Sequence, residues 1–261
     1  MNTILRTFVF TLFLFLGIHA SKAQSTHNHA ACGVSFENSL EIKARMLENR
    51  RNKAQLLQTF HQRNDTSYAP VVLHMVNRTD GTGGPTLQSA LNFLCNINAN
   101  YAGMKIQFYL HEPVRVINNT LLFEDGNTES AKYFMNMYKV QGPINVFFVQ
   151  NTPGNGGYYL GGTQNDFICI PQYNMNHLEV GTHEFGHFFT LPHTFFGWEG
   201  QQYSDVVANA NGRTPSFVAS SGVEVENIAR SGSMENCESA ADGFCGTNPS
   251  YAFRGANPNS N

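Results

Sequence analysis

The pattern of apolar and polar residues predicts helices and strands in alternation along most of the chain. Apolar residues recur at helical spacing after Thr86, a good N-cap, which predicts a helix to about Ala102. A second helix is expected to open at Asn127 or Thr128 and to run to about Val140. Stretches rich in branched and aromatic residues predict strands at residues 70–77, 105–111, 144–149, 158–161 and 167–170. We therefore expect an α+β fold, a mixed sheet with packed helices.

The first 68 residues have a different pattern. Arg6 precedes an apolar run that ends at Ile18, and small residues at positions 21–23 suit a cleavage site, so residues 1–23 are predicted to be a secretory signal peptide. The run is too short for a membrane anchor, although a retained tether is the alternative. Residues 24–68 form a propeptide-like leader with a polar helix from about Asn38 to Gln62, and residues 69–261 form the main domain.

The stretch THEFGHFFTLPHTF, residues 182–195, carries the candidate chemistry. Residues four apart on a helix lie on one face, so His183 and His187 can direct ring nitrogens at one metal ion. Glu184 is rotated from His183 by about 100°. Its carboxylate then lies beside the metal, where it can act as a general base toward a bound water. The helix is expected to start at Asn174 or Asn176.

Proline ends this helix and allows a third ligand. Pro192 cannot continue a helix, so the helix is predicted to stop near Phe189 and the following turn to bring His193 to the metal. Three imidazoles with a fourth position left for water are typical of a catalytic zinc. A thermolysin-like site with Glu199 or Glu224 as third ligand is the weaker alternative. The strand residues His74 and His111 are expected to be core or rim histidines.

The run HEFGHFFTLPHTF resembles the HExxHxxGxxH signature of metzincin metalloproteases, with an ending typical of the pappalysin family. The likeness extends from about Ala69 through the Gly-rich residues 155–162 to residues 244–245. It implies a zincin-like catalytic domain with a twisted mixed sheet and an irregular C-terminal subdomain. In that family the edge strand of the sheet binds extended substrate. The candidate residues for this strand are Tyr158, Tyr159, Leu160 and Gly161, with an ordinary hairpin as the alternative.

Two departures from the family pattern concern the zinc region. Thr190 stands where the family has Gly or Asn, and a β-branched residue in a left-handed turn is strained by roughly 1–2 kcal/mol. The family also has a Met-turn beneath the metal. The one methionine after His193 is Met234, which lies outside the expected context. The C-terminal subdomain therefore looks incomplete.

The chain has five cysteines, and an odd number leaves at least one unpaired in an oxidising compartment. Cys237 and Cys245 are close enough in sequence to pair with each other, or each with other partners. Cys32 lies in the leader. Because a thiolate is a good zinc ligand, Cys32 is a candidate for the fourth position and for a propeptide switch; an incidental or disulfide-bonded cysteine is the alternative.

Composition narrows the function further. A net charge of −3 with 13% charged residues provides no basic field for nucleic acid and no polybasic patch for stable membrane association, which leaves proteins or peptides as partners. The resemblance also implies a second metal, because pappalysins often bind calcium in the region after the motif. Asp242 and Glu238 are oxygen donors of the right kind there, although two acids alone do not make a site. We predict a secreted zinc endopeptidase, extracellular or periplasmic. A catalytically impaired secreted zinc-containing binding module is the alternative.

Overall fold

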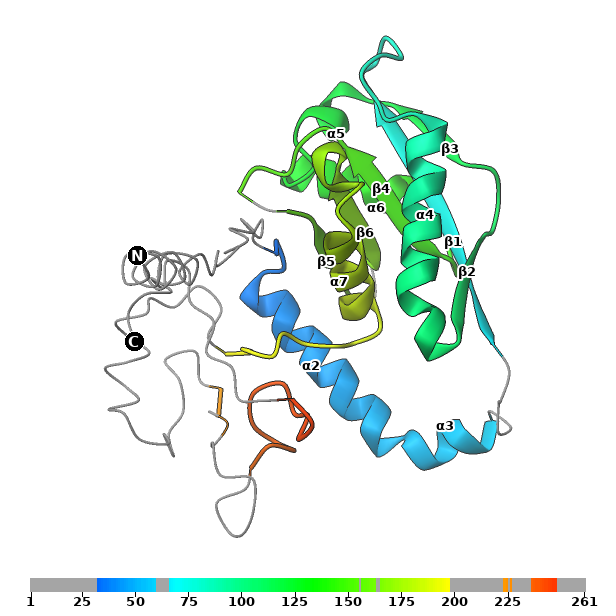
Figure 1. The fold of residues 1–261 in the computed structure, drawn as a ribbon. Coiled ribbons are helices and arrows are strands. Elements are labelled where there is room, and N and C mark those ends of the chain that lie inside the picture. Colours follow the sequence, from blue (N-terminus) through cyan, green and yellow to red (C-terminus); the bar gives the residue numbers. More distant parts are fainter. Residues whose placement is uncertain are drawn as a thin grey trace, which may run out of the picture.

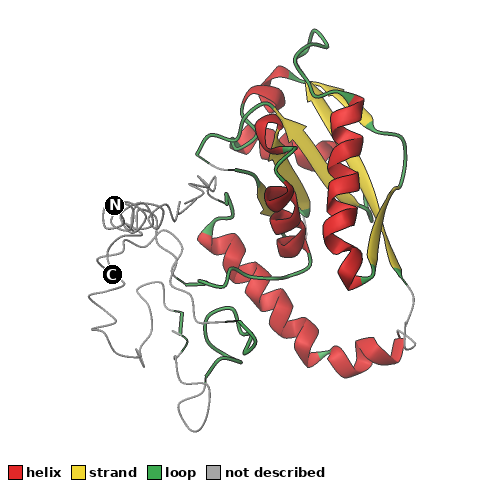
Figure 2. Ribbon diagram, in the orientation of Figure 1, coloured by secondary structure: helices red, strands yellow, loops and turns green. Residues whose placement is uncertain are grey.

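The computed structural model describes residues 32–59, 66–154, 156–162, 165–197, 223–224, 226 and 236–247. The predicted signal peptide and Met234 lie outside these residues. Six strands form one sheet in this part of the chain (Figure 1, Figure 2). They are β1 (Ser67–Asn77), β2 (Ile106–Leu110), β3 (Arg115–Asn118), β4 (Ile144–Val149), β5 (Tyr158–Leu160) and β6 (Phe167–Pro171).

The longest strand, β1, organises the sheet. It pairs in parallel with β2 through its first half and with β3 through its second half, while β4 runs parallel to it on the other side. The order continues to β6 and then to β5, which pairs antiparallel with β6. All six residues of β4 are buried, as expected for a central strand with both faces covered. A mixed sheet with packed helices agrees with the predicted α+β class.

Helices cover both faces of the sheet (Figure 2). The α-helices in the described residues are α2 (Phe36–Arg51), α3 (Lys53–Thr59), α4 (Leu87–Tyr101), α5 (Thr120–Glu124), α6 (Glu129–Tyr138) and α7 (Leu178–Phe188). The side chain of Thr86 accepts a hydrogen bond from the amide of Ser89 at the start of α4, and Thr128 caps α6 in the same way. Both N-caps lie where the sequence predicts them.

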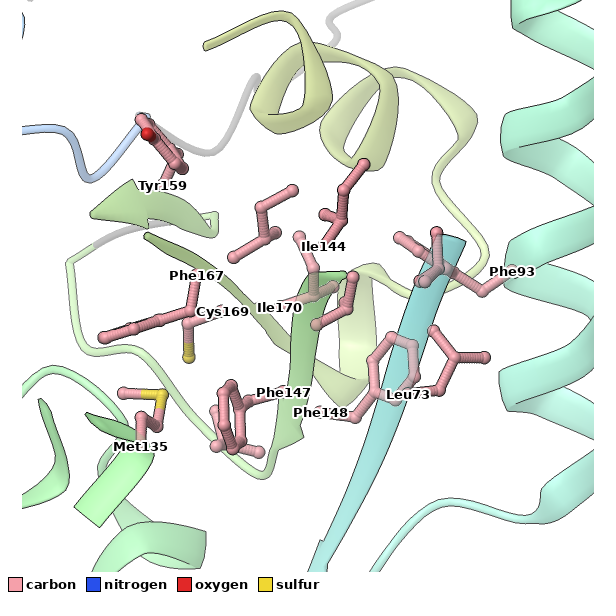
Figure 3. Packing of buried hydrophobic residues seen from close by; sticks show 14 of the residues in the cluster. Leu73, Phe93, Met135, Ile144, Phe147, Phe148, Tyr159, Phe167, Cys169 and Ile170 are labelled. Carbon is pink, nitrogen blue, oxygen red and sulfur yellow. The ribbon is translucent and has the colours of Figure 1, made fainter. Parts of the chain in front are cut away.

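Alternate side chains of the central strands point to opposite faces and fill two layers of core. Phe148 of β4 packs against Phe93 of α4, with ring centroids 5.1 Å apart. The side chain of its neighbour Phe147 points to the other face of the sheet. Figure 3 shows Phe147 and Cys169 on that face, toward Met135 of α6. The sheet is therefore enclosed between α4 and α7 on one face and α5 and α6 on the other.

The absence of a side chain at Gly181 lets α7 lie close to α4. A Cβ atom at this position would lie 2.6 Å from the ring of Phe93 and 2.8 Å from Ile97. Both neighbours are buried in the core and have little room to move. Close packing against α4 thus fixes where α7, and the motif that it carries, lies over the sheet.

The leader is an integral part of the packed structure. Ile42 and Met46 of α2 are almost fully buried, and Ile42 belongs to the main core cluster. Lys43 donates a hydrogen bond to the carbonyl of Ala241, in the segment closed by a disulfide between Cys237 and Cys245. The helix therefore joins the sheet side of the molecule to the C-terminal loop (Figure 1).

Several predicted boundaries were wrong in detail. The leader helix begins at Phe36 with Ser35 as its N-cap, and it breaks at Asn52 between α2 and α3. Strand β1 begins at Ser67, earlier than the predicted start at residue 70. Helix α7 begins at Leu178 with His177 as its N-cap, one residue after Asn176; the other predicted start, Asn174, donates its side-chain amide to the carbonyl of Gly156 and does not cap the helix. The short elements β3 and α5 were not predicted.

None of the helices in the described ranges is long and apolar enough to cross a membrane.

The side chain of His74, on β1, is buried in the core and has no exposed surface, as expected for a strand histidine. The amide of Val140 donates to Oδ1 of Asn145, which identifies this atom as the oxygen, so Nε2 of His74 must donate to it. Burial lowers the pKa of His74 to about 4; the bond to Asn145 opposes the shift and Arg115 adds to it. His74 is therefore neutral in the folded chain.

We expect the free energy of unfolding to fall as pH is lowered from 6.5 towards 4. In this window the unfolded chain binds a proton at His74 that the folded chain does not. The contribution of neutral His74 to the free energy of unfolding is therefore fully present above the ordinary pKa of 6.5. The loss is roughly 3 kcal/mol for a shift of this size. The free energy of unfolding, measured with urea in the presence of a metal chelator, should depend less on pH for His74→Gln than for the parent. The exposed His111 is the control, since a profile flattened equally by His111→Gln would contradict the assignment.

Candidate metal centre

Three histidine side chains converge at the end of α7. Nε2 of His187 lies 2.9 Å from Nε2 of His183 and 3.1 Å from Nε2 of His193, and the distance between Nε2 of His183 and Nε2 of His193 is 3.3 Å. Three ring nitrogens this close cannot all be satisfied by hydrogen bonds, because each nitrogen carries at most one proton. The arrangement instead suits three lone pairs directed at a common cation.

The spacing fits a tetrahedral zinc ion. Nitrogens about 2.0–2.1 Å from a tetrahedral centre lie about 3.3–3.4 Å from one another. The 3.3 Å separation between His183 and His193 matches this value, and the other two separations are shorter. Cys32 completes the group, and its Sγ lies 3.5 Å from Nε2 of His187. The four ligand atoms all lie within 4.8 Å of one another, and no second group of three or more such residues occurs in the described parts of the chain. The sequence motif and the leader cysteine are thus brought together.

Hydrogen bonding prepares His187 as a ligand. Nδ1 of His187 lies 2.8 Å from the carbonyl oxygen of Leu191, which can only accept, so Nδ1 carries the proton and Nε2 keeps its lone pair. Desolvation lowers the pKa of His187 well below its ordinary value, and the neighbouring His183 and His193 add to this. Desolvation and then His193 also lower the pKa of His183. These two imidazoles are neutral at neutral pH, the form that binds metals.

Glu184 lies beside the histidines and faces the same centre. Its side chain is 1% exposed, and its Oε1 accepts a contact of 3.5 Å from the thiol of Cys32. Burial raises the pKa of Glu184 to about 8, while contacts from Cys32 and from the backbone of Tyr159 lower it in part. Its second oxygen, Oε2, is buried and has no hydrogen-bond partner. A buried carboxyl group with an unused oxygen next to a ligand cluster is suited to proton transfer.

The turn after α7 delivers His193. The amide of Leu191 donates to the carbonyl of Gly186, and that of Thr190 donates to the carbonyl of His187, the two bonds of a Schellman motif. Thr190 has the left-handed conformation that the motif requires, with φ at 67°. The helix thus ends where Pro192 predicts. The sequence left open whether the turn differs at Thr190 or the strain is tolerated; the left-handed φ shows that the turn forms despite the β-branched side chain.

The candidate substrate strand lies at the end of the described sheet. The side chains of Tyr158 and Tyr159 are buried, and Tyr159 donates its hydroxyl proton to Asp166 while Arg45 of the leader donates to the same hydroxyl. Leader residues lie along the outer side of the strand, where Cys32 forms a parallel bridge with Gly157. The leader therefore covers the strand in this structure, and its role toward substrate stays a prediction.

The remaining candidates lie away from the histidine group. The carboxylate of Glu224 accepts hydrogen bonds from Asn236 and Ser239, which leaves the thermolysin-like alternative without support from this residue, and Glu199 lies outside the described residues. Both oxygens of Asp242 accept bonds from its own turn, and Glu238 is exposed, so nothing here indicates a calcium site. Cys95 is exposed and Cys169 is buried, both as free thiols.

Sequence reasoning missed two contributors to this region. The first is the carbonyl of Leu191, which fixes the tautomer of His187. The chain reversal at Thr190 is the sequence feature from which this contact could have been inferred. Asn38 of α2 binds the backbone on both sides of Leu160, and no local pattern marks that contact.

Comparison with known proteins adds no assignment. The chain matches no protein-family model, and a search of the curated proteins found no match.

Thr190→Gly is expected to raise the free energy of unfolding by about 0.5–1 kcal/mol. Glycine removes a strain of about 1–2 kcal/mol at a positive φ, an effect partly offset by the larger entropy of the unfolded glycine chain. Thr190→Ala is the control, because it keeps the strain and loses the 3.4 Å contact from Asn49. Chemical unfolding should rank glycine above threonine; a glycine variant no more stable than the alanine variant would contradict the strain. Zinc stoichiometry should be the same in all three.

Proposed function

We propose that this chain is the latent form of a secreted zinc-dependent endopeptidase of the metzincin type, similar to the pappalysins, that hydrolyses proteins or peptides. The observation that carries the proposal is the convergence of Nε2 atoms from His183, His187 and His193, at 2.9–3.3 Å, beside the buried carboxyl group of Glu184. The resemblance of the HEFGHFFTLPHTF run supports it from the sequence.

Each residue then has a role that follows from its surroundings. The three imidazoles hold the metal, and the bond from His187 to the Leu191 carbonyl keeps one of them in the ligating tautomer. When bound, zinc supplies Lewis acidity toward the scissile carbonyl, a lowered pKa for water, and a positive charge that favours the carboxylate form of Glu184. Glu184 accepts the proton of the attacking water and returns it to the leaving amine.

Latency follows from the position of Cys32. A thiolate sulfur at about 2.3 Å and an imidazole nitrogen at about 2.0–2.1 Å from a tetrahedral zinc lie about 3.5–3.6 Å apart. The separation between Sγ of Cys32 and Nε2 of His187 is 3.5 Å, which supports a thiolate at the fourth position. That position is the one that water must occupy for hydrolysis, so the leader silences the site until it is displaced.

A structural zinc module is the second candidate, and a closed set of four protein ligands favours it. Such a site needs no general base. The buried Glu184, with one oxygen that lacks a hydrogen-bond partner, favours the peptidase because a carboxyl group without a function is costly to bury. The proton-transfer role of this residue therefore separates the two functions.

Glu184→Gln should abolish cleavage while leaving the metal bound. Glutamine keeps the shape and a hydrogen-bonding oxygen but cannot take a proton, and general-base catalysis is typically worth about 10²–10⁴-fold. Zinc content and casein cleavage should be measured for parent and variant after removal of the leader. The exposed Glu179, on the first turn of α7, provides the control as Glu179→Gln. Equal cleavage by the parent and Glu184→Gln would remove the role assigned here; a zinc-loaded, processed parent that cleaves nothing would favour the structural module.

Cys32→Ala should shorten the latency of the full-length chain. Alanine cannot ligate zinc, so water gains the fourth position, and casein cleavage by the unprocessed chain should begin earlier than in the parent. Cys95→Ala is the matched control, since Cys95 is an exposed free thiol on α4, outside the leader. An identical lag for Cys32→Ala and the parent would rule out the thiol as a switch.

A further inference from the structure

The outer side of β5 presents backbone groups that an added strand would use. Strand β5 pairs antiparallel with β6 through all three of its residues, and the carbonyl of Leu160 accepts a bond from the amide of Asp166 on the β6 side. Because successive residues of a strand point their backbone groups to opposite sides, those of Gly157, Tyr159 and Gly161 point away from β6. An extended peptide that pairs with this edge must bind these groups.

The leader already binds three of these groups. The amide of Gly33 donates to the carbonyl of Gly157 over 2.8 Å. The side-chain Nδ2 of Asn38 donates to the carbonyl of Tyr159 over 2.6 Å, and the amide of Gly161 donates to Oδ1 of Asn38 over 3.0 Å. Asn38 is 6% exposed, so both bonds are shielded from water. One carboxamide thus supplies the donor and the acceptor that a peptide main chain would supply.

We propose that Asn38 is a latency residue in its own right, which closes the outer edge of β5 by taking the place of a substrate peptide group. The inference rests on the proposed function and extends it. The thiol of Cys32 blocks the metal, and the amide of Asn38 blocks the strand beside it. The leader and an extended substrate therefore exclude each other at Tyr159 and Gly161.

The rest of α2 keeps Asn38 in position. Ser35 caps the helix by accepting a bond from the amide of Asn38 itself, which places this residue in the first turn. Two turns further on, Arg45 donates to the hydroxyl of Tyr159 over 2.6 Å and lies 3.6 Å from the carboxylate of Asp166. The helix is thus fastened to β5 at two points, both of which involve Tyr159.

The test uses the full-length, zinc-loaded chain carrying Glu184→Gln, so that a bound peptide is not cut. Asn38→Ala removes both bonds. Asn38→Asp keeps an acceptor for the Gly161 amide but places a second acceptor against the Tyr159 carbonyl. Glu48→Ala is the control, since Glu48 is exposed on the same helix. Amide hydrogen exchange at Gly161 and the affinity for a fluorescent, extended casein peptide are measured for each.

Asn38→Ala should speed exchange at Gly161 by about three- to tenfold, the effect of losing one hydrogen bond, and should bind the peptide about tenfold more tightly than the Glu48→Ala control. Asn38→Asp should keep Gly161 protected and still bind the peptide more tightly, and it decides the case if Asn38→Ala does not fold. Peptide affinities equal to the control in the folded Asn38 variants would overturn the proposal, because Asn38 would then only fasten the helix. Failure of the peptidase assignment appears separately, as no casein cleavage by the processed chain with Glu184 intact.

Discussion

The backbone turn from Phe189 to His193 brings the three histidines of the candidate metal centre together. Helical spacing alone brings His183 and His187 together, but two imidazoles do not enclose an ion. The Schellman bonds reverse the chain at Thr190, and this reversal brings His193 within 3.1 Å of His187 and the Leu191 carbonyl onto its Nδ1. The same turn thus brings the third imidazole of the candidate metal centre into place and sets the tautomer of the second. The left-handed strain at Thr190 is the energetic cost of both.

The sheet and its helices hold this turn in place relative to the leader. Gly181 lets α7 approach α4, and α7 in turn lies next to β5 and β6. Glu184 therefore faces the backbone of Tyr159, and the leader that runs along β5 brings the thiol of Cys32 to the histidines. Residues 32–38 of the leader therefore contact the histidines, Glu184 and the backbone of β5.

Features set by local sequence were predictable, and those set by distant contacts were not. The caps at Thr86 and Thr128 and the end of α7 before Pro192 depend on neighbouring residues, and the histidine ligand group follows from the spacing of the motif. Of the two predicted starts of α7, Asn176 lies next to the observed N-cap His177, whereas Asn174 binds the carbonyl of Gly156, a partner that no local pattern reveals. The contact of Asn38 with Tyr159 spans 121 residues and required the folded chain. Elements as short as β3 and α5 carry too few residues to display a period.

We propose that one zinc ion is held by three imidazoles of the α7 motif and by the leader thiol. X-ray absorption spectroscopy of the zinc-loaded, full-length chain measures these ligands directly. We expect three nitrogen neighbours at about 2.0–2.1 Å and one sulfur at about 2.3 Å, with the sulfur alone lost in Cys32→Ala. A parent spectrum without sulfur, or one with fewer than three imidazoles, would rule out this ligand set.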